Sequence, residues 1–353
     1  FGTDMGWSDF ARIQTVEQAR EDVALQGAAE SLAHSIDAYN HSTAALASNN
    51  WVGTVGNNVA THLDAMQALT RLRQEGVTGT DLHYVLNSTD QMLLGDQVIK
   101  LPAPDGMATA AYRNGYKNMI SDVPTLFTEQ LPVLTVGTRV LGAALVNGAA
   151  QNVNYTDVAV QTTVNGRYLT QTIAIDGLAA GATIRRGEVF TYPGVFAYDN
   201  RKQALVQPPR LQQFTVVDDA TANGAGQIAE LRISPAMIVP GSGAGQNIAI
   251  NTAHATVDAA PADNAALTFL GAANAQLAPR LLVDKQAIEI NTMDLVMPPN
   301  TPDARRQRLP NLPLSVRMWP NAAFNTGEFG VRFDVAINAN IRDRRRIVRL
   351  NGS

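Results

Sequence analysis

Five histidines are the residues of this chain best suited to bind a metal ion or to transfer protons near neutral pH. They are His34, His41, His62, His83 and His254. None belongs to a His-Glu-x-x-His motif, and the first two lie two helical turns apart, too far to share one metal without further ligands. The chain has no cysteine, which excludes disulfides, thiolate nucleophiles and zinc–thiolate sites. We therefore predict no metal site, no catalytic residue and no cofactor.

The run Gly241-Ser242-Gly243-Ala244-Gly245 is rich enough in glycine to approach a phosphate closely. It lacks the Gly-Lys-Ser/Thr of a P-loop and the spacing of a dinucleotide fingerprint, so a flexible loop is the better interpretation. No Gly-x-Ser-x-Gly nucleophile elbow occurs in the chain. Carboxylates are abundant, but the sequence alone cannot pair them into a general acid and base. These patterns favour a protein that is not an enzyme.

Arginine dominates the C-terminal segment. From Thr301 to Ser353 the chain holds ten arginines and four acidic residues, a net charge of +6. The candidate interaction residues form two clusters: Arg305, Arg306 and Arg308, then Arg342, Arg344, Arg345 and Arg346. We favour pairing with the acidic surface of a neighbouring copy of the chain. Salt-dependent contact with nucleic-acid phosphates and a solvated turn are the alternatives, and no interleaved aromatic residues support specific nucleic-acid recognition.

The overall composition predicts a folded chain with a weakly charged surface. The 353 residues are enough for two or three domains. Charged residues make up 16 %, against about 25 % in an average soluble domain. Arginine outnumbers lysine by 23 to 4, and arginine forms bidentate ion pairs that tolerate desolvation. A surface hidden against neighbours fits both features, and family drift or a GC-rich genome fits them equally well.

The sequence predicts no membrane segment. No charge-free stretch is continuously apolar over the ~18 residues that a membrane-spanning helix needs. No signal peptide is visible, so synthesis in the cytosol is the simplest expectation. The chain opens with Phe1, from which we expect that an N-terminal segment has been removed.

Helical patterns fill the first third of the chain. Thr15-Val16-Glu17-Gln18 has the form of a capping box. Apolar residues then recur with helical spacing to about Ala47, which predicts a helix about 45–50 Å long. A second helix is predicted from Asn58 to Gln74, with Gly76 as its C-terminal cap. The shorter elements predicted next are a strand at His83–Leu86 and a helix at Ser88–Leu94.

From Val153 the period of the apolar residues changes from 3.6 to 2. Alternation before and after Asn165-Gly166 predicts a hairpin with a type I′ turn, formed by residues 153–164 and 169–175. Three more strands are predicted at Gly187–Tyr192, Gln212–Val217 and Gln227–Ile233. Short strands at this spacing predict a small barrel or sandwich.

The last third is predicted to mix helix and strand. Residues 234–265 predict long loops, and a helix is predicted near Asn264–Gln276. The strands predicted after it are Arg280–Leu282, Ala287–Ile290, Gly330–Ala339 and Arg346–Leu350, the last two as a closing pair. An order of helical, then all-β, then mixed segments favours one domain interrupted by another, with the first and last thirds sharing a core.

Four places in the chain resemble the P22-type phage coat proteins, in that family's order. They are Ala111–Gly115 with Leu131–Thr135, Thr183–Glu188 with Pro193–Val195, the hairpin-rich run to Ile233–Pro235, and the ending from Arg332 to Leu350. The second of these is similar to a strand-turn-strand of the family's inserted domain. The family also places an N-terminal arm and an extended loop before its long helix, and this chain has almost nothing there.

The resemblance implies an α+β, HK97-like capsid fold with an inserted all-β barrel domain. Residues 1–145 would form the first part of the capsid core, with a spine helix at 16–47 and an axial domain at 58–130. Residues 146–240 would form the barrel. Residues 241–353 would return to the axial domain and supply the closing strands of the peripheral domain.

The implied function is that of a major capsid protein. Such a protein self-assembles through pentamers and hexamers into an icosahedral phage head enclosing double-stranded DNA. Its partners would be copies of itself, a scaffolding protein, a portal protein, the packaged DNA bound non-specifically and, as a further candidate, a decoration protein. It would belong to the virion capsid, after assembly in the host bacterial cytoplasm. The alternatives are an encapsulin-like compartment and, less favoured because of the long helix, a β-rich adhesin or tail protein.

Overall fold

The computed structural model of the chain describes residues 2–8, 23–79, 81–99, 119–140, 144–161, 169–297, 305–308, 314–323 and 328–351. It contains both helices and strands, as the α+β prediction requires. The chain divides into two compact units. The first unit combines Phe1–Thr43 with Glu289–Asn340, and the second combines Ala44–Ile288 with Ile341–Ser353. Each unit is therefore built from two segments that are far apart in the sequence.

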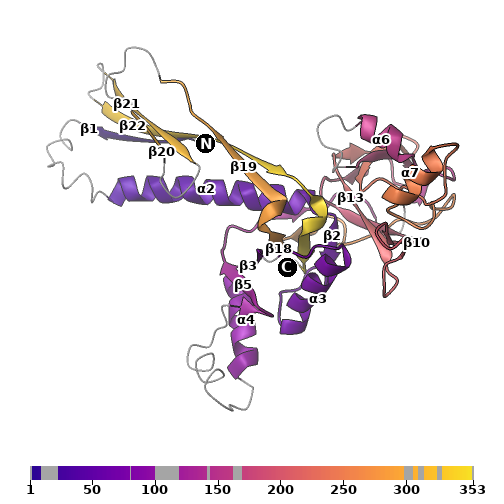
Figure 1. The fold of residues 1–353 in the computed structure, drawn as a ribbon. Coiled ribbons are helices and arrows are strands. Elements are labelled where there is room, and N and C mark those ends of the chain that lie inside the picture. The colour runs from indigo at the N-terminus through magenta and orange to yellow at the C-terminus, as the bar shows by residue number, and fades with distance from the viewer. Residues whose placement is uncertain are drawn as a thin grey trace. The chain divides into compact units, whose positions relative to one another are not determined.

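The first unit contains most of one long helix and a five-stranded sheet (Figure 1). Its elements are β1 (Gly2–Ser8), α2 (Val23–Ala47), β19 (Ile288–Met293), β20 (Arg305–Arg308), β21 (Ser315–Ala323) and β22 (Glu328–Ile341). The sheet has the order β1-β22-β21-β20, and β19 also pairs with β22. β1 runs antiparallel to β22, with Gly2 opposite Asp334 and Ser8 opposite Glu328. The N-terminal strand thus shares a sheet with strands from the last quarter of the chain.

Helix α2 ends at Ala47, where the sequence predicts its end. The predicted capping box at residues 15–18 and the predicted start at Val16 lie outside the described residues. Within the described part, the buried side chains of the helix are Ala28, Leu32, Ala44, Ala45 and Ala47. Small alanines at the C-terminal end let neighbouring backbone approach the helix closely.

The second unit contains a six-stranded sheet that joins early and late segments of the chain. Its order is β2-β23-β18-β3-β5-β4. The strands are β2 (Asn50–Val52), β3 (Leu82–Leu86), β4 (Met119–Ile120), β5 (Val123–Phe127), β18 (Arg280–Asp284) and β23 (Ile347–Leu350). β2 and β23 are parallel, with Trp51 opposite Arg349. The first and last thirds of the chain therefore share a core, as predicted.

Two helices accompany this sheet. Helix α3 (His62–Gln74) begins at a capping box in which Thr61 and Asp64 satisfy each other's backbone amides. Its buried face, which includes Leu69 and Leu72, belongs to the same apolar cluster as Tyr84 and Val348. Helix α4 (Ser88–Ile99) continues past Gly95, where the sequence predicts its end. One glycine inside a helix costs only about 1 kcal/mol relative to alanine, which surrounding contacts can offset.

The predicted closing strand pair is wrong, although both strands exist. β22 and β23 lie in different sheets. The short helix η3 (Arg344–Arg346) separates them and redirects the chain. All four residues of β23 are buried, and a strand buried on both faces needs neighbours on both edges. β18 and β2 provide those neighbours.

A second six-stranded sheet of the same unit has the order β16-β10-β13-β15-β8-β7. Its strands are β7 (Leu145–Val146), β8 (Gln171–Asp176), β10 (Val189–Phe196), β13 (Leu211–Val216), β15 (Ile228–Ser234) and β16 (Thr268–Phe269). The segment before β16 bonds to β7, since the Leu267 amide donates to Ala144 (2.9 Å) and the Val146 amide donates to Ala265 (3.0 Å). Backbone hydrogen bonds therefore connect the two edges of this sheet, β16 and β7, into a closed ring.

The core of this sheet is aromatic. Phe190 lies within 5.0–5.7 Å of the ring centroids of Tyr192, Phe214 and Phe269. All four side chains are buried. They come from β10, β13 and β16, so three strands are joined by ring contacts as well as by backbone hydrogen bonds.

Three predictions in this region are wrong. Residues 155–161 form helix α6 (Tyr155–Gln161) instead of a strand, whereas the second strand of the predicted hairpin is β8 and its turn, Asn165-Gly166, lies outside the described residues. Within the predicted loops, residues 247–254 form helix α7 (Asn247–His254). No helix forms at 264–276, where residues 264, 271 and 274 have positive φ.

Residues 155–161 form a helix, where the sequence predicts a strand, because of tertiary contacts. The rings of Tyr155 and His254 stack with centroids 3.7 Å apart and planes 7° from parallel. The Tyr155 amide donates to the side chain of Asn251 at 2.9 Å. Contacts with α7 therefore override the alternating valines that predict a strand.

Truncation of Leu72 tests the packing of α3. Leu72 is fully buried, whereas Leu63 on the same helix is 66 % exposed. We expect Leu72→Ala to lower the free energy of unfolding by roughly 2–5 kcal/mol, and Leu63→Ala by less than ~0.5 kcal/mol. Urea unfolding of both variants measures the difference, and equal midpoints would contradict the assigned packing.

Candidate functional site

The described residues provide no obvious catalytic or metal centre. Among them, no group of three or more His, Asp or Glu side chains is arranged to hold a metal ion. None of the helices in the described ranges is long and apolar enough to cross a membrane. His254 packs against Tyr155 and so takes part in the α6–α7 contact. The candidates that remain are the charged clusters of the C-terminal segment and the arginines inside the second unit.

The first predicted arginine cluster lies on β20, an edge strand of the sheet in the first unit. Arg308 donates to Asp294 at 2.9 Å, and Arg306 lies 4.0 Å from the same carboxylate. The hydrogen bond from Arg308 is the chief cause that lowers the pKa of Asp294. The backbone of Arg305 pairs with Met318. One carboxylate facing two arginines, which are 40 % and 76 % exposed, leaves positive charge at the surface of this edge.

The second predicted cluster lies at η3 in the second unit. Asp343 caps this short helix and pairs with Arg345 at 3.0 Å. Arg346 donates to Asp284, a fully buried carboxylate on β18, at 2.7 Å. The backbone amide of Arg342 donates to Ala287 at 2.8 Å, and Arg344 belongs to η3 itself. Arg346 therefore contributes to the fold of the second unit.

The structure assigns the two clusters to different compact units. Arg305, Arg306 and Arg308 belong to the first unit, whereas Arg342, Arg344, Arg345 and Arg346 belong to the second. The sequence does not distinguish them, because both are short runs of arginine next to one aspartate. Exposure differs between single residues, since Arg308 is 76 % and Arg346 is 29 % exposed, but it does not separate the clusters, because Arg345 is 56 % and Arg306 is 40 % exposed.

Three arginines that the sequence analysis does not single out are the largest fully buried side chains among the described residues. They are Arg139, Arg280 and Arg349. A buried cation is costly unless acceptors surround it. Each of the three has several acceptors, drawn from segments that are far apart in the sequence.

Arg349, on β23, is held mainly by backbone carbonyls. Its Nη1 donates to the carbonyl of Gly187 at 2.6 Å, and its Nη2 donates to that of Ser48 at 2.8 Å. The guanidinium carbon lies 4.6 Å from the centroid of the Trp51 ring. Burial lowers the pKa of Arg349 to about 9, so the group is charged at neutral pH. Among the described residues no carboxylate accepts from it. Carbonyl dipoles at the end of α2 and an aromatic face stabilise the charge instead.

The groups around Arg349 are fixed by one another. The Ser48 hydroxyl donates to the carbonyl of Ile347 at 2.7 Å, and the Thr215 hydroxyl donates to that of Ser48 at 2.9 Å. Gly187 has a φ of +90°, and a Cβ there would lie 2.8 Å from Leu46. This position therefore requires glycine. The network joins the end of α2, β23, β13 and the turn before β10.

Arg280 and Asp90 form a second buried group. Arg280 Nε donates to Asp90 Oδ2 at 2.6 Å, and neither side chain is exposed. Asp90 also accepts from the amides of Val59 and Asn87, at 2.9 and 3.2 Å. Arg280 donates further to the side chain of Asn58 at 2.6 Å. This group links β18 with the start of α4 and with the segment before α3.

Arg139 and Glu188 form the third. Arg139 Nε donates to Glu188, and its guanidinium carbon lies 3.8 Å from the centroid of the Phe269 ring. Glu188 also accepts from the amides of Gly137 and Arg185, at 2.8 and 2.7 Å. The sequence signal for a buried arginine is a charge within a strongly apolar run, as in Ile347-Val348-Arg349-Leu350. For Arg139, the partner Glu188 lies in the Thr183–Glu188 motif.

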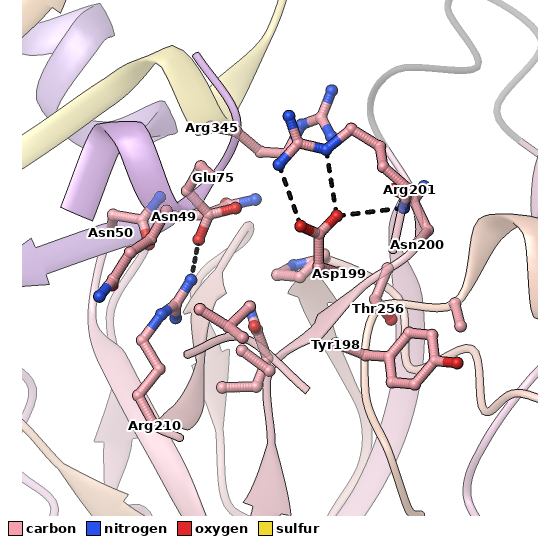
Figure 2. Close-up of a pocket in the computed structure, with 16 residues that line it drawn as sticks. Asn49, Asn50, Glu75, Tyr198, Asp199, Asn200, Arg201, Arg210, Thr256 and Arg345 are labelled. Carbon is pink, nitrogen blue, oxygen red and sulfur yellow. Dashed lines mark hydrogen bonds and ion pairs between the residues drawn. The ribbon is translucent and has the colours of Figure 1, made fainter. Parts of the chain in front are cut away.

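A small cavity of about 80 Å³ lies in the second unit (Figure 2). Two ion pairs line it, Arg210 with Glu75 and Arg201 with Asp199. Arg201 binds Asp199 through its side chain and its backbone amide, and these hydrogen bonds lower the pKa of that carboxyl. Arg345 also lines the cavity. The volume is far below the ~300–1,000 Å³ of typical pockets for organic ligands.

Replacement of Arg349 by methionine tests the buried network. We expect Arg349→Met to lower the free energy of unfolding by roughly 3 kcal/mol, because the buried carbonyl of Gly187 loses the Arg349 donor and that of Ser48 keeps only the Thr215 hydroxyl. Arg232→Met is the matched control, since Arg232 is 50 % exposed and pairs with Asp218 at 3.4 Å; it should change stability by less than ~0.5 kcal/mol. Urea unfolding measures both, and a loss below ~1 kcal/mol for Arg349→Met would refute the role of the network.

Comparison with known families gives one match. The family model described as "P22 coat protein - gene protein 5" matches residues 8–346, nearly the whole chain. No curated protein matches the chain. The resemblance based on four separate places in the sequence is thus confirmed over almost its full length. The chain belongs to the P22 coat protein family of bacteriophage major capsid proteins.

Proposed function

We propose that the protein self-assembles through pentamers and hexamers into an icosahedral phage head that encloses double-stranded DNA. The family match over residues 8–346 carries this proposal. The two-segment construction of each compact unit supports it. A subunit whose early and late segments share each core can move as a rigid body while its contacts with neighbours change.

The proposed architecture is the HK97-like capsid fold. Helix α2 would be the spine helix, the sheet of the first unit the peripheral domain, and the sheet containing β23, with α3 and α4, the axial domain. The expected barrel at 146–240 contains β8, β10, β13 and β15. We propose that it extends from about residue 144 to 269, because β7 and β16 complete its ring of hydrogen bonds.

The connections of the β-rich segment support an insertion. β6 (Leu134–Thr135) precedes it and β17 (Gln276–Leu277) follows it, and the two strands pair antiparallel. The chain therefore enters and leaves this segment at neighbouring points. An inserted domain needs that arrangement, because the host domain must continue where it was interrupted.

Assembly would use many weak contacts. A closed shell multiplies the contacts of each subunit, so that no single interface needs high affinity. Arg305, Arg306 and Arg308 on the edge strand β20 are our first candidates for pairing with an acidic surface of a neighbouring copy. Scaffolding, portal and decoration proteins and the packaged DNA are the proposed partners, and assembly would take place in the host bacterial cytoplasm.

Charge reversal on β20 tests the proposed interface. The double variant Arg306→Glu/Arg308→Glu should leave the unfolding midpoint of the subunit nearly unchanged. It should lower the yield of closed particles at least ~10-fold when the subunit is mixed with scaffolding protein, since repulsion replaces pairing at every copy of the contact. Sedimentation and negative-stain electron microscopy measure the yield.

The matched control reverses two arginines of the second unit, Arg185 and Arg232, which are 52 % and 50 % exposed. Normal particle yield from the β20 variant, or an equal loss in the control, would refute the interface. If the double variant does not fold, the particle yield of the single variant Arg308→Gln is measured instead. Uniform round particles from the unmodified chain support the assembly proposal. Particles that hold a protein cargo and exclude DNA would support the encapsulin-like alternative instead.

A further inference from the structure

The cavity beside Glu75 has more donors than acceptors. Arg210 uses one guanidinium nitrogen to bind Glu75. Its Nε and Nη1 are buried and have no acceptor among the described residues, and the same holds for Nη1 of Arg71. Buried N–H groups are normally satisfied by protein, water or a bound ligand. Against these three donors stands one buried acceptor without a partner among the described residues, Oδ1 of Asn49, which also lines the cavity.

The charges near the cavity leave a positive excess. The lining holds three arginines, Arg201, Arg210 and Arg345, against two carboxylates, Glu75 and Asp199, a net charge of +1. Outside the lining, Arg71 interacts electrostatically with Glu75 and Arg210, and Asp343 pairs with Arg345. Burial, and then the nearby charge of Arg210, lower the pKa of Arg71 to about 10. Glu75 therefore does not neutralise the two guanidinium groups beside it.

We propose that this cavity binds a small tetrahedral oxyanion of the phosphate class, held by Arg210 in its lining and by Arg71 behind Glu75. Guanidinium groups match the geometry of such oxygens and bind them through charge-assisted hydrogen bonds. The volume of about 80 Å³ exceeds the ~10–15 Å³ that one water needs and is too small for a nucleotide. A single inorganic ion fits between these limits.

The ion would join two parts of the second unit. Arg71 lies on α3, one turn before Glu75, whereas Arg210 directly precedes β13. Figure 2 shows the Arg210 side chain reaching Glu75 from the sheet side of the cavity. An oxyanion bound to both arginines would add a bridge between α3 and the β-rich sheet. This inference does not rest on the proposed assembly function.

Titration of the purified full chain with inorganic phosphate tests the site. Ionic strength is held constant with sodium chloride, and sodium acetate serves as a second reference. We expect a saturable rise in Tm with phosphate and none with the other two salts, since a ligand that binds only the folded state stabilises it in proportion to its occupancy. Isothermal titration calorimetry gives the Kd and the stoichiometry, expected to be one ion per chain.

Each substitution around the cavity should change the affinity for phosphate in a stated direction. Arg210→Gln should abolish the shift, and Arg71→Gln should weaken binding at least ~10-fold by removing a charge-assisted hydrogen bond. Glu75→Gln should tighten binding several-fold, because it removes a competing carboxylate and frees a nitrogen of Arg210. Arg232→Gln, on an exposed pair, should change nothing.

The gain expected for Glu75→Gln separates an anion site from a purely structural ion pair, and it remains informative if Arg210→Gln does not fold. Equal Tm values in phosphate, acetate and chloride would overturn the proposal. Unchanged phosphate affinity in both Arg71→Gln and Glu75→Gln would also overturn it.

Discussion

The buried guanidinium of Arg349 is the constraint on which the second unit depends. Its two terminal nitrogens bind the carbonyls of Gly187 and Ser48, and its plane lies over Trp51. These acceptors come from the turn before β10, from the end of α2 and from the strand that pairs with β23. Because the charge is fully desolvated, it is tolerated only while all these groups remain in place. One side chain near the C-terminus thus requires the correct assembly of segments from the whole length of the chain.

Arginine suits this role in a way that lysine does not. Its planar fork can bind two carbonyls in different directions and still pack against a ring. Arg139 and Arg280 use the same property, since each bonds through more than one nitrogen to groups from separate segments. Part of the excess of arginine over lysine in the composition therefore reflects internal bonding. From the sequence alone, that excess fits ion pairs at outer surfaces or a GC-rich genome, because burial is not visible in a residue count.

The sequence predicts elements well where the local pattern and the tertiary environment agree. The end of α2 at Ala47, the strand β3 and the strands β10, β13 and β15 all lie where apolar periodicity predicts them. The pattern fails at α6, where stacking on His254 overrides alternating valines. It also fails at 264–276, where residues in the left-handed region prevent a continuous helix.

At the candidate site, too, the sequence predicts local patterns but not contacts between distant segments. Runs of arginine are visible in the sequence, so both C-terminal clusters could be predicted. The sequence could not show that Arg346 binds a buried carboxylate on β18 while Arg308 stays exposed. Nor could it predict the cavity near Glu75, because Arg201 and Arg210, which line it, are far in the sequence from Glu75 and from Arg345. Such sites exist only after distant segments have come together.

Under the proposed function the subunit keeps its own fold while its contacts with neighbours change, and the buried arginines would supply that internal stability. Native-state hydrogen exchange of the purified chain tests this claim most directly. If Arg349 joins the segments around it, the amides of β2, β13 and β23 should open together, with one free energy and one denaturant dependence. Exchange of β13 through an independent opening, while β23 stays protected, would contradict the account.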